Sequence, residues 1–375
     1  MKYNIKKIVM NTIITTIVFV FLFLAFMYGR KYYRDLPTEF KINQLENSHV
    51  YSRLLNSREY VGVTNKDPYI SSAYRPGDKL YKPLLAVQQG RWDEAQELLE
   101  PLVMAGDTTA MFWLAEINYS TGAFSGTYGA TLFKKAAKLG NPYAALKLDS
   151  NNEECQRFMG RHCSKEWGDL AEKLLEERAA NGDYKARFAL SRYRGWNSKE
   201  DFNEAVEAVI ESAKNHYFRP LMEVAFPYYD ASDIERTKIE SDLIRFMLHH
   251  NYPRAILMLH YGEREFSDEY KKEIYEKYML LVGHKDLAIL DYYGENYRND
   301  RDKLIYSLAF SMLSNTYKNE YGGKVRIWEF EHRYLESGDK FTEEEINKAK
   351  SLFEEMKSKS TPVIYIDEIE PRRYL

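Results

Sequence analysis

The chain has 375 residues, of which 45% are hydrophobic, and its formal net charge is −3. Its 19 glycines and 11 prolines are too few for a low-complexity chain. Of its 53 basic and 56 acidic residues, four basic and no acidic ones lie in the first 30 positions, so the rest carries a balance of −7. A mildly acidic body argues against a nucleic-acid-binding protein, because phosphate recognition needs a basic surface.

The first element in chain order is an apolar run at residues 8–28. In a helix that rises ~1.5 Å per residue, a run of this length reaches about 31 Å and spans a hydrocarbon core. Aromatic and cationic residues follow it at 29–34, as is typical of a membrane interface. We therefore predict that residues 1–30 form an uncleaved signal anchor. A cleaved signal peptide is the alternative, but its apolar region would be shorter and would end in small residues.

The orientation of this anchor follows from the short segment that precedes it. A short N-terminal tail usually stays inside the cytoplasm, although the basic residues on the two sides of the span nearly balance. We therefore expect the body of the protein outside the cytoplasm. In a bacterium with two membranes, that compartment is the periplasm.

A polar, proline-containing tether is predicted at residues 31–79, with one helix near 44–56. From residue 80 onward, apolar residues at helical spacing predict a succession of helices. The predicted helices cover 80–89, 93–105, 108–120, 128–139, 167–181, 183–194, 199–215, 221–226, 232–249, 253–261, 267–282, 285–293 and 300–317.

A short pattern recurs among these helices. In its clearest copy, the turn-forming Gly106 is followed by Ala110 and then by Leu114. We call the first residue of each copy the repeat anchor; the anchors lie at positions 106, 140, 182, 216, 251 and 283. A near-fixed period in this range is typical of a helical repeat array whose units share one core. We assign residues 80–295 to this array.

The clearest copy resembles the Sel1-like repeats, which are relatives of tetratricopeptide repeats with variable length. The residues that carry the resemblance are Gly106, Ala110, Leu114, Tyr119, Gly122, Ala136, Ala137 and Gly140. The resemblance implies an all-α fold, a right-handed α-solenoid that binds partners and carries no chemistry. Bacterial members of the family include envelope proteins, signalling adaptors and immunity proteins that neutralise toxins delivered by neighbouring cells.

One repeat step is longer than the others, and its extra segment at 151–164 contains the two cysteines, Cys155 and Cys163. A disulfide between them would clip a loop in an oxidising compartment. Two free thiols are the alternative, because spacing alone does not determine the geometry. A metal site is disfavoured, since His162 is the one further ligand nearby and structural zinc needs four.

Residues 296–375 depart from the period and are predicted to form a helical cap and a tail. Helices are predicted at 324–335 and 342–357. Thr342 and Glu345 have the spacing of a capping box, and Phe341 and Ile346 that of a hydrophobic staple. We expect this last helix to cover the open end of the array. The tail at 362–375 starts with an apolar run and is predicted to be a short strand or an extended segment on the solenoid.

No sequence motif of an enzyme is present. The chain lacks a GxxxxGK[ST] phosphate loop, an HExxH metal pair and a GxSxG nucleophile elbow. His249, His250 and His260 fall near consecutive helices, but histidines at helix ends more often bond terminal carbonyls than metals. We therefore expect no catalytic residues, no cofactor and no bound metal.

Aromatic side chains are the candidate partner-binding residues. The resemblance implies that the first helix of each pair lines the concave face of the solenoid. Eight aromatic residues lie in or just after those helices: Trp113, Tyr119, Tyr193, Tyr228, Tyr229, Tyr261, Tyr292 and Tyr293. Aromatic rings are common anchors in protein interfaces, although packing between helices is the alternative for each of them.

These features together predict a single-pass inner-membrane protein whose periplasmic body binds another protein. The leading hypothesis is an immunity protein, because an anchor would place it where a periplasmic toxin acts. A structural or assembly adaptor of a cell-envelope complex is the alternative. No nucleic-acid partner is expected.

Overall fold

The computed structural model describes residues 65–119, 126–225, 234–256, 300–316, 327–336 and 338–369, together with 266, 267, 270, 274 and 371. All of them belong to one compact unit, which spans residues 50–375. This described part is all-α, with fourteen α-helices, one 3-10 helix and a single isolated β-bridge. None of its helices is long and apolar enough to cross a membrane. The anchor predicted at residues 8–28 lies outside the described residues.

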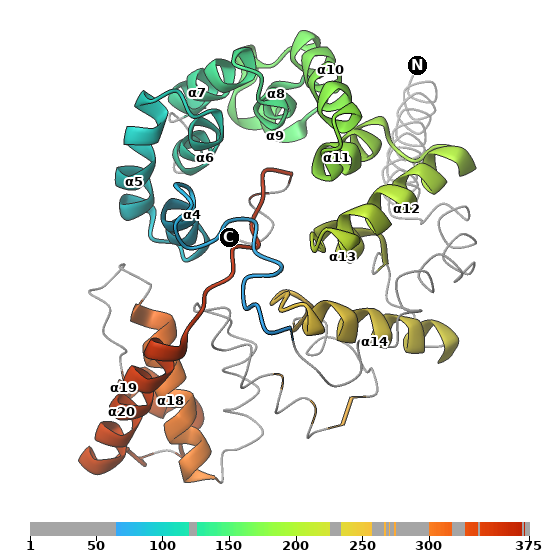
Figure 1. The fold of residues 1–375 in the computed structure, drawn as a ribbon. Coiled ribbons are helices and arrows are strands. Elements are labelled where there is room, and N and C mark those ends of the chain that lie inside the picture. The colour runs from blue at the N-terminus through green and yellow to red at the C-terminus, as the bar shows by residue number, and fades with distance from the viewer. Residues whose placement is uncertain are drawn as a thin grey trace, which may run out of the picture. The chain divides into compact units, whose positions relative to one another are not determined.

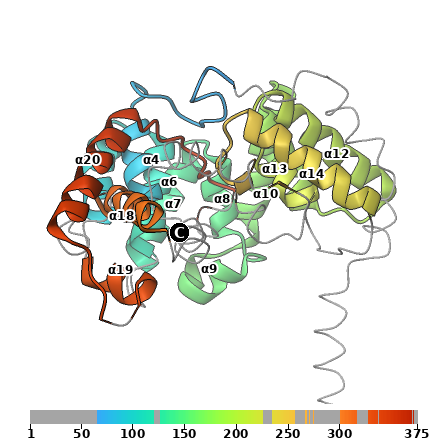
Figure 2. The ribbon, with the colours of Figure 1, turned by 90° about the horizontal axis from the view of Figure 1, so that it is seen from below.

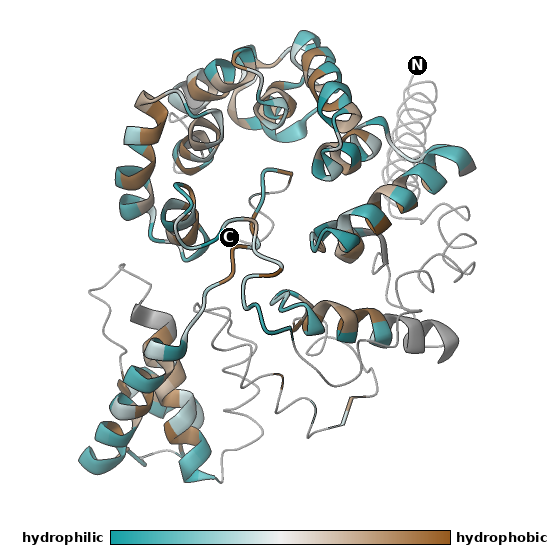
Figure 3. Ribbon diagram, in the orientation of Figure 1, coloured by the Kyte–Doolittle hydropathy of each residue, from teal (hydrophilic) through white to brown (hydrophobic). Residues whose placement is uncertain are grey.

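The first eleven helices pack as consecutive pairs, and most of them contact the helices next to them in sequence. We call them the helix array (Figure 1). They are α4 (Tyr81–Gln88), α5 (Trp92–Met104), α6 (Thr108–Tyr119), α7 (Gly126–Lys138), α8 (Pro142–Leu148), α9 (Glu153–Phe158), α10 (Lys165–Ala180), α11 (Tyr184–Arg194), α12 (Lys199–Lys214), α13 (Arg219–Ala225) and α14 (Ile234–His249). Figure 3 shows hydrophobic and hydrophilic residues alternating along these helices.

The repeat anchors are the residues at which one pair ends and the next begins. Gly106, Gly140 and Gly182 have φ values of 88°, 91° and 87°, in the left-handed region that glycine enters without strain. His216 and Asn251 adopt the same conformation, with φ of 62° and 58°, although they carry side chains. The sixth predicted anchor, at 283, lies outside the described residues.

The same pair of backbone hydrogen bonds closes the helix at each of these five anchors. The amide of the anchor donates to the carbonyl three residues earlier, and the next amide donates to the carbonyl five residues earlier. This arrangement is the Schellman motif, which satisfies carbonyls that the helix end leaves without partners. The recurring pattern in the sequence is therefore a recurring helix-ending turn.

The residue after the anchor starts the next helix in the first three copies. Asp107, Asn141 and Asp183 each accept a hydrogen bond from the amide three residues later, at 2.9–3.0 Å. That amide belongs to an alanine that is fully buried in all three copies, which lets the helices approach closely. In the last two copies, Tyr217 and Tyr252 take the place of this cap.

A second group of helices comprises α18 (Arg301–Thr316), α19 (Ile327–Tyr334) and α20 (Glu343–Lys359), and α18 contacts both of the others (Figure 2). The capping box predicted at Thr342 and Glu345 is confirmed. Arg301 of α18 joins it, with Nε 2.6 Å from the Glu345 carboxylate. This hydrogen bond is the main reason why the pKa of Glu345 is lowered to about 2.

Two chain segments without helix complete the described part. Residues 361–367 are extended, as the sequence predicted for the tail, and they lie on the helix array without strand pairing. Residues 65–74, which the sequence assigned to the tether, also pack on the array. The Asn65 amide donates to the His249 carbonyl at 2.9 Å, and the Ser71 hydroxyl donates to the Asn251 carbonyl at 2.9 Å.

Candidate functional site

The candidate site is the side of the helix array that holds residues 361–369, which we call the C-terminal segment. The segment contacts α4, α11 and the first residue of α13, and its Glu368 lines a cavity together with Tyr143 of α8. Each of these is the first helix of a pair, the set that the family resemblance predicted to line the concave face. We call the surface that these helices present to the segment the inner face (Figure 1).

Helix α4 binds the backbone of the C-terminal segment through side chains. The Gln88 amide nitrogen donates to the Val363 carbonyl at 2.9 Å, and its oxygen accepts from the Tyr365 amide at 2.9 Å. The Tyr81 hydroxyl donates to the Pro362 carbonyl at 2.7 Å. Gln88 thus binds a peptide backbone as an adjacent strand would, with one donor and one acceptor.

The segment at residues 65–74 supplies the remaining backbone contacts. The Ile364 amide donates to the Ser72 hydroxyl at 2.9 Å, and the Ile364 carbonyl accepts from the Ala73 amide at 2.9 Å. The side chains of Val363, Ile364 and Ile366 are at most 1% exposed. The backbone bonds therefore hold these apolar side chains against the core.

Two acidic residues end the bound stretch, and we call Asp367 and Glu368 the acidic pair. The Tyr217 hydroxyl donates to the Asp367 carboxylate at 2.7 Å, and Arg219 Nε lies 3.5 Å from the same oxygen. Lys185 forms an ion pair with Glu368. Both carboxylates are at most 6% exposed, so their charges depend on these partners.

The pKa shifts of the partners reflect this coupling. Burial alone would lower the pKa of the Lys185 ammonium, but the charges of Glu368 and Asp367 outweigh burial and raise it. Burial, and then the Asp367 charge, raise the pKa of the Tyr217 hydroxyl well above its usual range. The Lys185 ammonium also lies 4.8 Å from the ring centroid of Tyr143. Near neutral pH, Lys185 stays charged and Tyr217 stays a hydrogen-bond donor.

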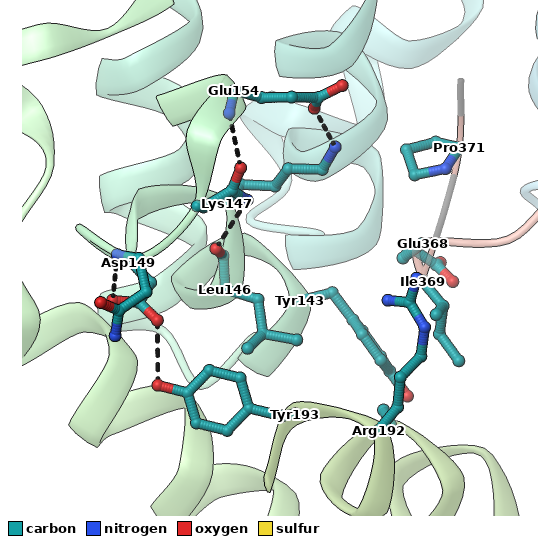
Figure 4. Close-up of a pocket in the computed structure, with 13 residues that line it drawn as sticks. Tyr143, Leu146, Lys147, Asp149, Glu154, Arg192, Tyr193, Glu368, Ile369 and Pro371 are labelled. Atoms are coloured by element: carbon teal, nitrogen blue, oxygen red, sulfur yellow. Dashed lines mark hydrogen bonds and ion pairs between the residues drawn. The ribbon is translucent and has the colours of Figure 1, made fainter. Parts of the chain in front are cut away.

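A polar cavity of about 910 Å³ adjoins the acidic pair (Figure 4). Residues of α8, α9 and α11, the turn between α8 and α9, the C-terminal segment and Pro371 beyond it line the cavity: Tyr143, Leu146, Lys147, Asp149, Asn151, Asn152, Glu154, Ala189, Arg192, Tyr193, Glu368, Ile369 and Pro371. Several charged side chains of its wall already have partners. Lys147 Nζ lies 2.9 Å from Glu116 and 3.2 Å from Glu154, and these carboxylates raise its pKa although burial opposes the shift.

One of the predicted aromatic residues, Tyr193, lies in the wall of this cavity. Its hydroxyl donates to the Asp149 carboxylate at 2.9 Å, and burial together with this bond raises its pKa. Gly168 of α10 leaves room for the pair, since a Cβ on Gly168 would lie 2.5 Å from the Tyr193 hydroxyl. Tyr193 is therefore a half-buried structural contact at the edge of the site.

Within the part of the chain that the structure describes, the other predicted aromatic residues do not gather at the inner face. Trp113 is fully buried and packs edge-on against Phe112, so its ring contributes to the core instead of an exposed surface. Tyr119 ends α6, but its side chain lies outside the described residues. The remaining five predictions also lie outside them: Tyr228, Tyr229, Tyr261, Tyr292 and Tyr293.

The two cysteines are joined in the structure. Cys155 in α9 and Cys163, just after the 3-10 helix η2 (Gly160–His162), form a disulfide with their Cα atoms 6.0 Å apart. The bridge clips the loop that follows α8, part of which lines the polar cavity. The sequence left two alternatives, a bridge and two free thiols, and the structure contains the bridge.

The histidines singled out in the sequence lie in an aromatic cluster. The ring of His250 stacks on His216 at 5.1 Å and contacts Phe246 at 4.6 Å, and its Nδ1 donates to the Phe246 carbonyl at 2.8 Å. His249 contacts the same ring, and His260 lies outside the described residues. Among the described residues, no group of three or more His, Cys, Asp or Glu side chains is arranged to hold a metal ion.

Sequence reasoning missed the residues that hold the C-terminal segment, above all Gln88, Lys185, Tyr217 and Arg219. One local signal was available, because Tyr217 replaces the Asp or Asn that follows earlier anchors. A second was the acidic pair directly after an apolar run. Neither signal shows which residues, more than a hundred positions away in the sequence, contact the acidic pair.

Comparison with known proteins does not assign the chain to a family. No model of a known protein family matches the sequence, and no curated protein matches it. The structure itself establishes an all-helical protein of stacked helix pairs.

Proposed function

We propose that this protein is a binding scaffold whose inner face holds an extended segment of another protein. The observation that carries the proposal is the C-terminal segment, which the inner face already binds in extended form. Gln88 and Tyr81 contact its backbone, and backbone contacts are available to any extended polypeptide. Protein binding is the role that such a surface performs without further chemistry.

The finer assignment to a right-handed solenoid of Sel1-like repeats is also part of this proposal. Its support is the regular recurrence of the anchor, with the same left-handed conformation in the five described copies. Stacked units of this kind expose a long continuous surface, which suits them to binding and not to catalysis. We accordingly propose that the protein acts by binding alone.

We further propose that the scaffold is anchored in the inner membrane, faces the periplasm and serves as an immunity protein. The apolar run at residues 8–28 supports the anchor. The disulfide between Cys155 and Cys163 supports an oxidising compartment, where such bridges persist. An immunity protein must meet its toxin where the toxin acts, and an anchored periplasmic scaffold satisfies that need.

The test of binding is affinity purification of the full-length protein, tagged at its N-terminus and solubilised from its own membranes. We expect one protein to co-purify in near-equal amount, identified by mass spectrometry. Recovery of the bait alone at several detergent and salt conditions would count against a scaffold.

The test of immunity is co-expression with the products of neighbouring genes directed to the periplasm. We expect one product to arrest growth and the full-length protein to restore it. If the co-purifying proteins are instead subunits of an envelope complex, and deletion dissociates that complex, the protein is an adaptor.

A further inference from the structure

The C-terminal segment shows what chemistry the inner face selects, and this inference rests on the function proposed above. We propose that residues 362–368 occupy the inner face in the free protein as an internal substitute for a partner segment. That partner segment is extended, apolar at three positions and acidic at the next two. The partner binds by displacing the C-terminal segment from the same contacts.

The first step concerns the apolar part of the contact. The side chains of Val363, Ile364 and Ile366 are buried, whereas Tyr365 is only half-buried and lies beside the Arg254 guanidinium, 5.4 Å from its ring centroid. Three positions of the segment therefore require apolar side chains, and the Tyr365 position tolerates other residues. This pattern defines the apolar half of a matching partner.

The second step is charge complementarity at the acidic pair. Lys185 and Arg219 face Glu368 and Asp367 from two different helix pairs, and the Arg219 and Asp367 side chains are each 3% exposed. A buried cation without its carboxylate is strongly unfavourable, so the inner face discriminates against a segment with neutral residues here. A partner must therefore carry two adjacent acids after its apolar residues.

The third step concerns how the segment is attached. Most hydrogen bonds to its backbone come from the side chains of Tyr81, Gln88 and Ser72. None of these bonds is part of a helix or of a pair of strands. Helix α20 ends at Lys359, and three half-buried residues without helix, 360–362, connect it to the buried part of the segment. The segment can therefore detach without breaking a helix. Its tether gives it an effective concentration of about millimolar, against which a partner must compete.

The experiment uses the full-length protein and a fluorescent peptide of residues 361–369 added in trans. We expect weak binding to the wild-type protein, because its own segment occupies the inner face. The double variant Asp367→Asn/Glu368→Gln weakens the internal segment but leaves the acids of the peptide intact. We expect it to bind the peptide at least tenfold more tightly, as measured by fluorescence anisotropy.

Two matched controls accompany this variant. Glu97→Gln/Glu204→Gln removes two exposed acids from α5 and α12 and should leave peptide affinity at the wild-type value. A peptide with Asn and Gln in place of its two acids should bind the weakened variant at least tenfold less tightly. If the folded variant does not bind the acidic peptide, or binds both peptides equally, the inference is overturned.

Hydrogen exchange of the wild-type protein tests the same point if the double variant fails to fold. We expect the amides of Ile364 and Tyr365 to exchange through an opening at least tenfold more frequent than the one that exposes α11 amides. If they exchange only with global unfolding, the segment is a permanent part of the core and the inference fails. A partner that still co-purifies with the wild-type protein would then leave the scaffold function standing.

Discussion

The helix array and the C-terminal segment are held by opposite kinds of contact. Most array helices pack on helices next to them in sequence, and five similar turns separate the pairs. The C-terminal segment instead makes hydrogen bonds to side chains 150 to 292 residues away. Contacts of the first kind recur with the repeat, whereas those of the second kind occur once.

This difference explains how the segment can influence the whole array. A repeat array is coupled only between nearest neighbours, so distant pairs bend and open independently. The C-terminal segment joins α4 at Gln88 to α11 at Lys185 and to α13 at Arg219. Whatever occupies the inner face therefore connects the first helix pair to two later pairs that are not next to it in sequence.

The largest expected effects come from deleting buried side chains in the two regions. Leu114→Ala in α6 and Ile364→Ala in the C-terminal segment each remove a side chain that is at most 1% exposed. Each should lower the free energy of unfolding by about 2–5 kcal/mol, measured by urea denaturation. Hydrogen exchange should distinguish the two regions. Exchange should be faster around α6 and α7 in Leu114→Ala and faster within the segment in Ile364→Ala. Equal acceleration throughout both regions would show that they form one cooperative unit.

The backbone contact at Gln88 should rank next. Gln88→Leu leaves the Val363 carbonyl and the Tyr365 amide buried without their present partners, which should cost about 2–4 kcal/mol in unfolding free energy. Gln96→Leu on α5 is the matched control, because its side chain bonds only the exposed Glu100 and should change stability by less than about 0.5 kcal/mol. Similar losses of unfolding free energy in the two variants would contradict a special role for Gln88.

The disulfide acts within the array and should have a smaller effect. Reduction of the Cys155–Cys163 bridge, which closes a short loop with a sequence separation of 8, should lower the unfolding free energy by about 2.5 kcal/mol. Urea denaturation with and without dithiothreitol measures this, and a Cys155→Ser/Cys163→Ser variant should not respond to the reductant. Hydrogen exchange of the C-terminal segment should change little, since the disulfide joins residues of one short loop. A reductant effect on the double variant would point to another cause.

Acid should weaken the contact between residues 65–71 and the C-terminal end of α14. Burial, opposed by its bond to the Phe246 carbonyl and assisted by His216 and His249, lowers the pKa of His250 to about 4. Because this pKa lies below the unfolded value of 6.5, the unfolded state takes up the proton first. Stability should be full above pH 6.5 and fall by about 2 kcal/mol as the pH drops toward 4. In His250→Phe, the unfolding free energy should vary less over this range; an unchanged pH profile would exclude His250 as the cause.

Much of the helix array could be predicted from the sequence. Where a helix was predicted in the described part, its ends lie within three residues of those observed, because capping residues, proline and apolar spacing are signals within one or two turns. The short helices α8 and α9 were given no predicted range. The anchors at Gly106, Gly140 and Gly182 were recognisable because glycine is suited to the left-handed turn. His216 and Asn251 were recognisable only through the period, since their residue types permit other conformations.

The candidate site could not be predicted in the same way. Trp113 has the residue type of an interface anchor, but neighbouring helices enclose it completely. Gln88 and Lys185 have the residue types of solvated helix positions, but the C-terminal segment covers them. Burial of this kind depends on which distant part of the chain arrives, and no local pattern records it.

The sequence by itself determined the helices, their turns and their repeat, because the hydrogen bonds and apolar spacing of a helix lie within a few residues of each other. Only the tertiary structure decided that the C-terminal segment occupies the inner face and which residues bind the acidic pair. Those contacts join positions more than a hundred residues apart, and they form only after the helix pairs have stacked into one surface.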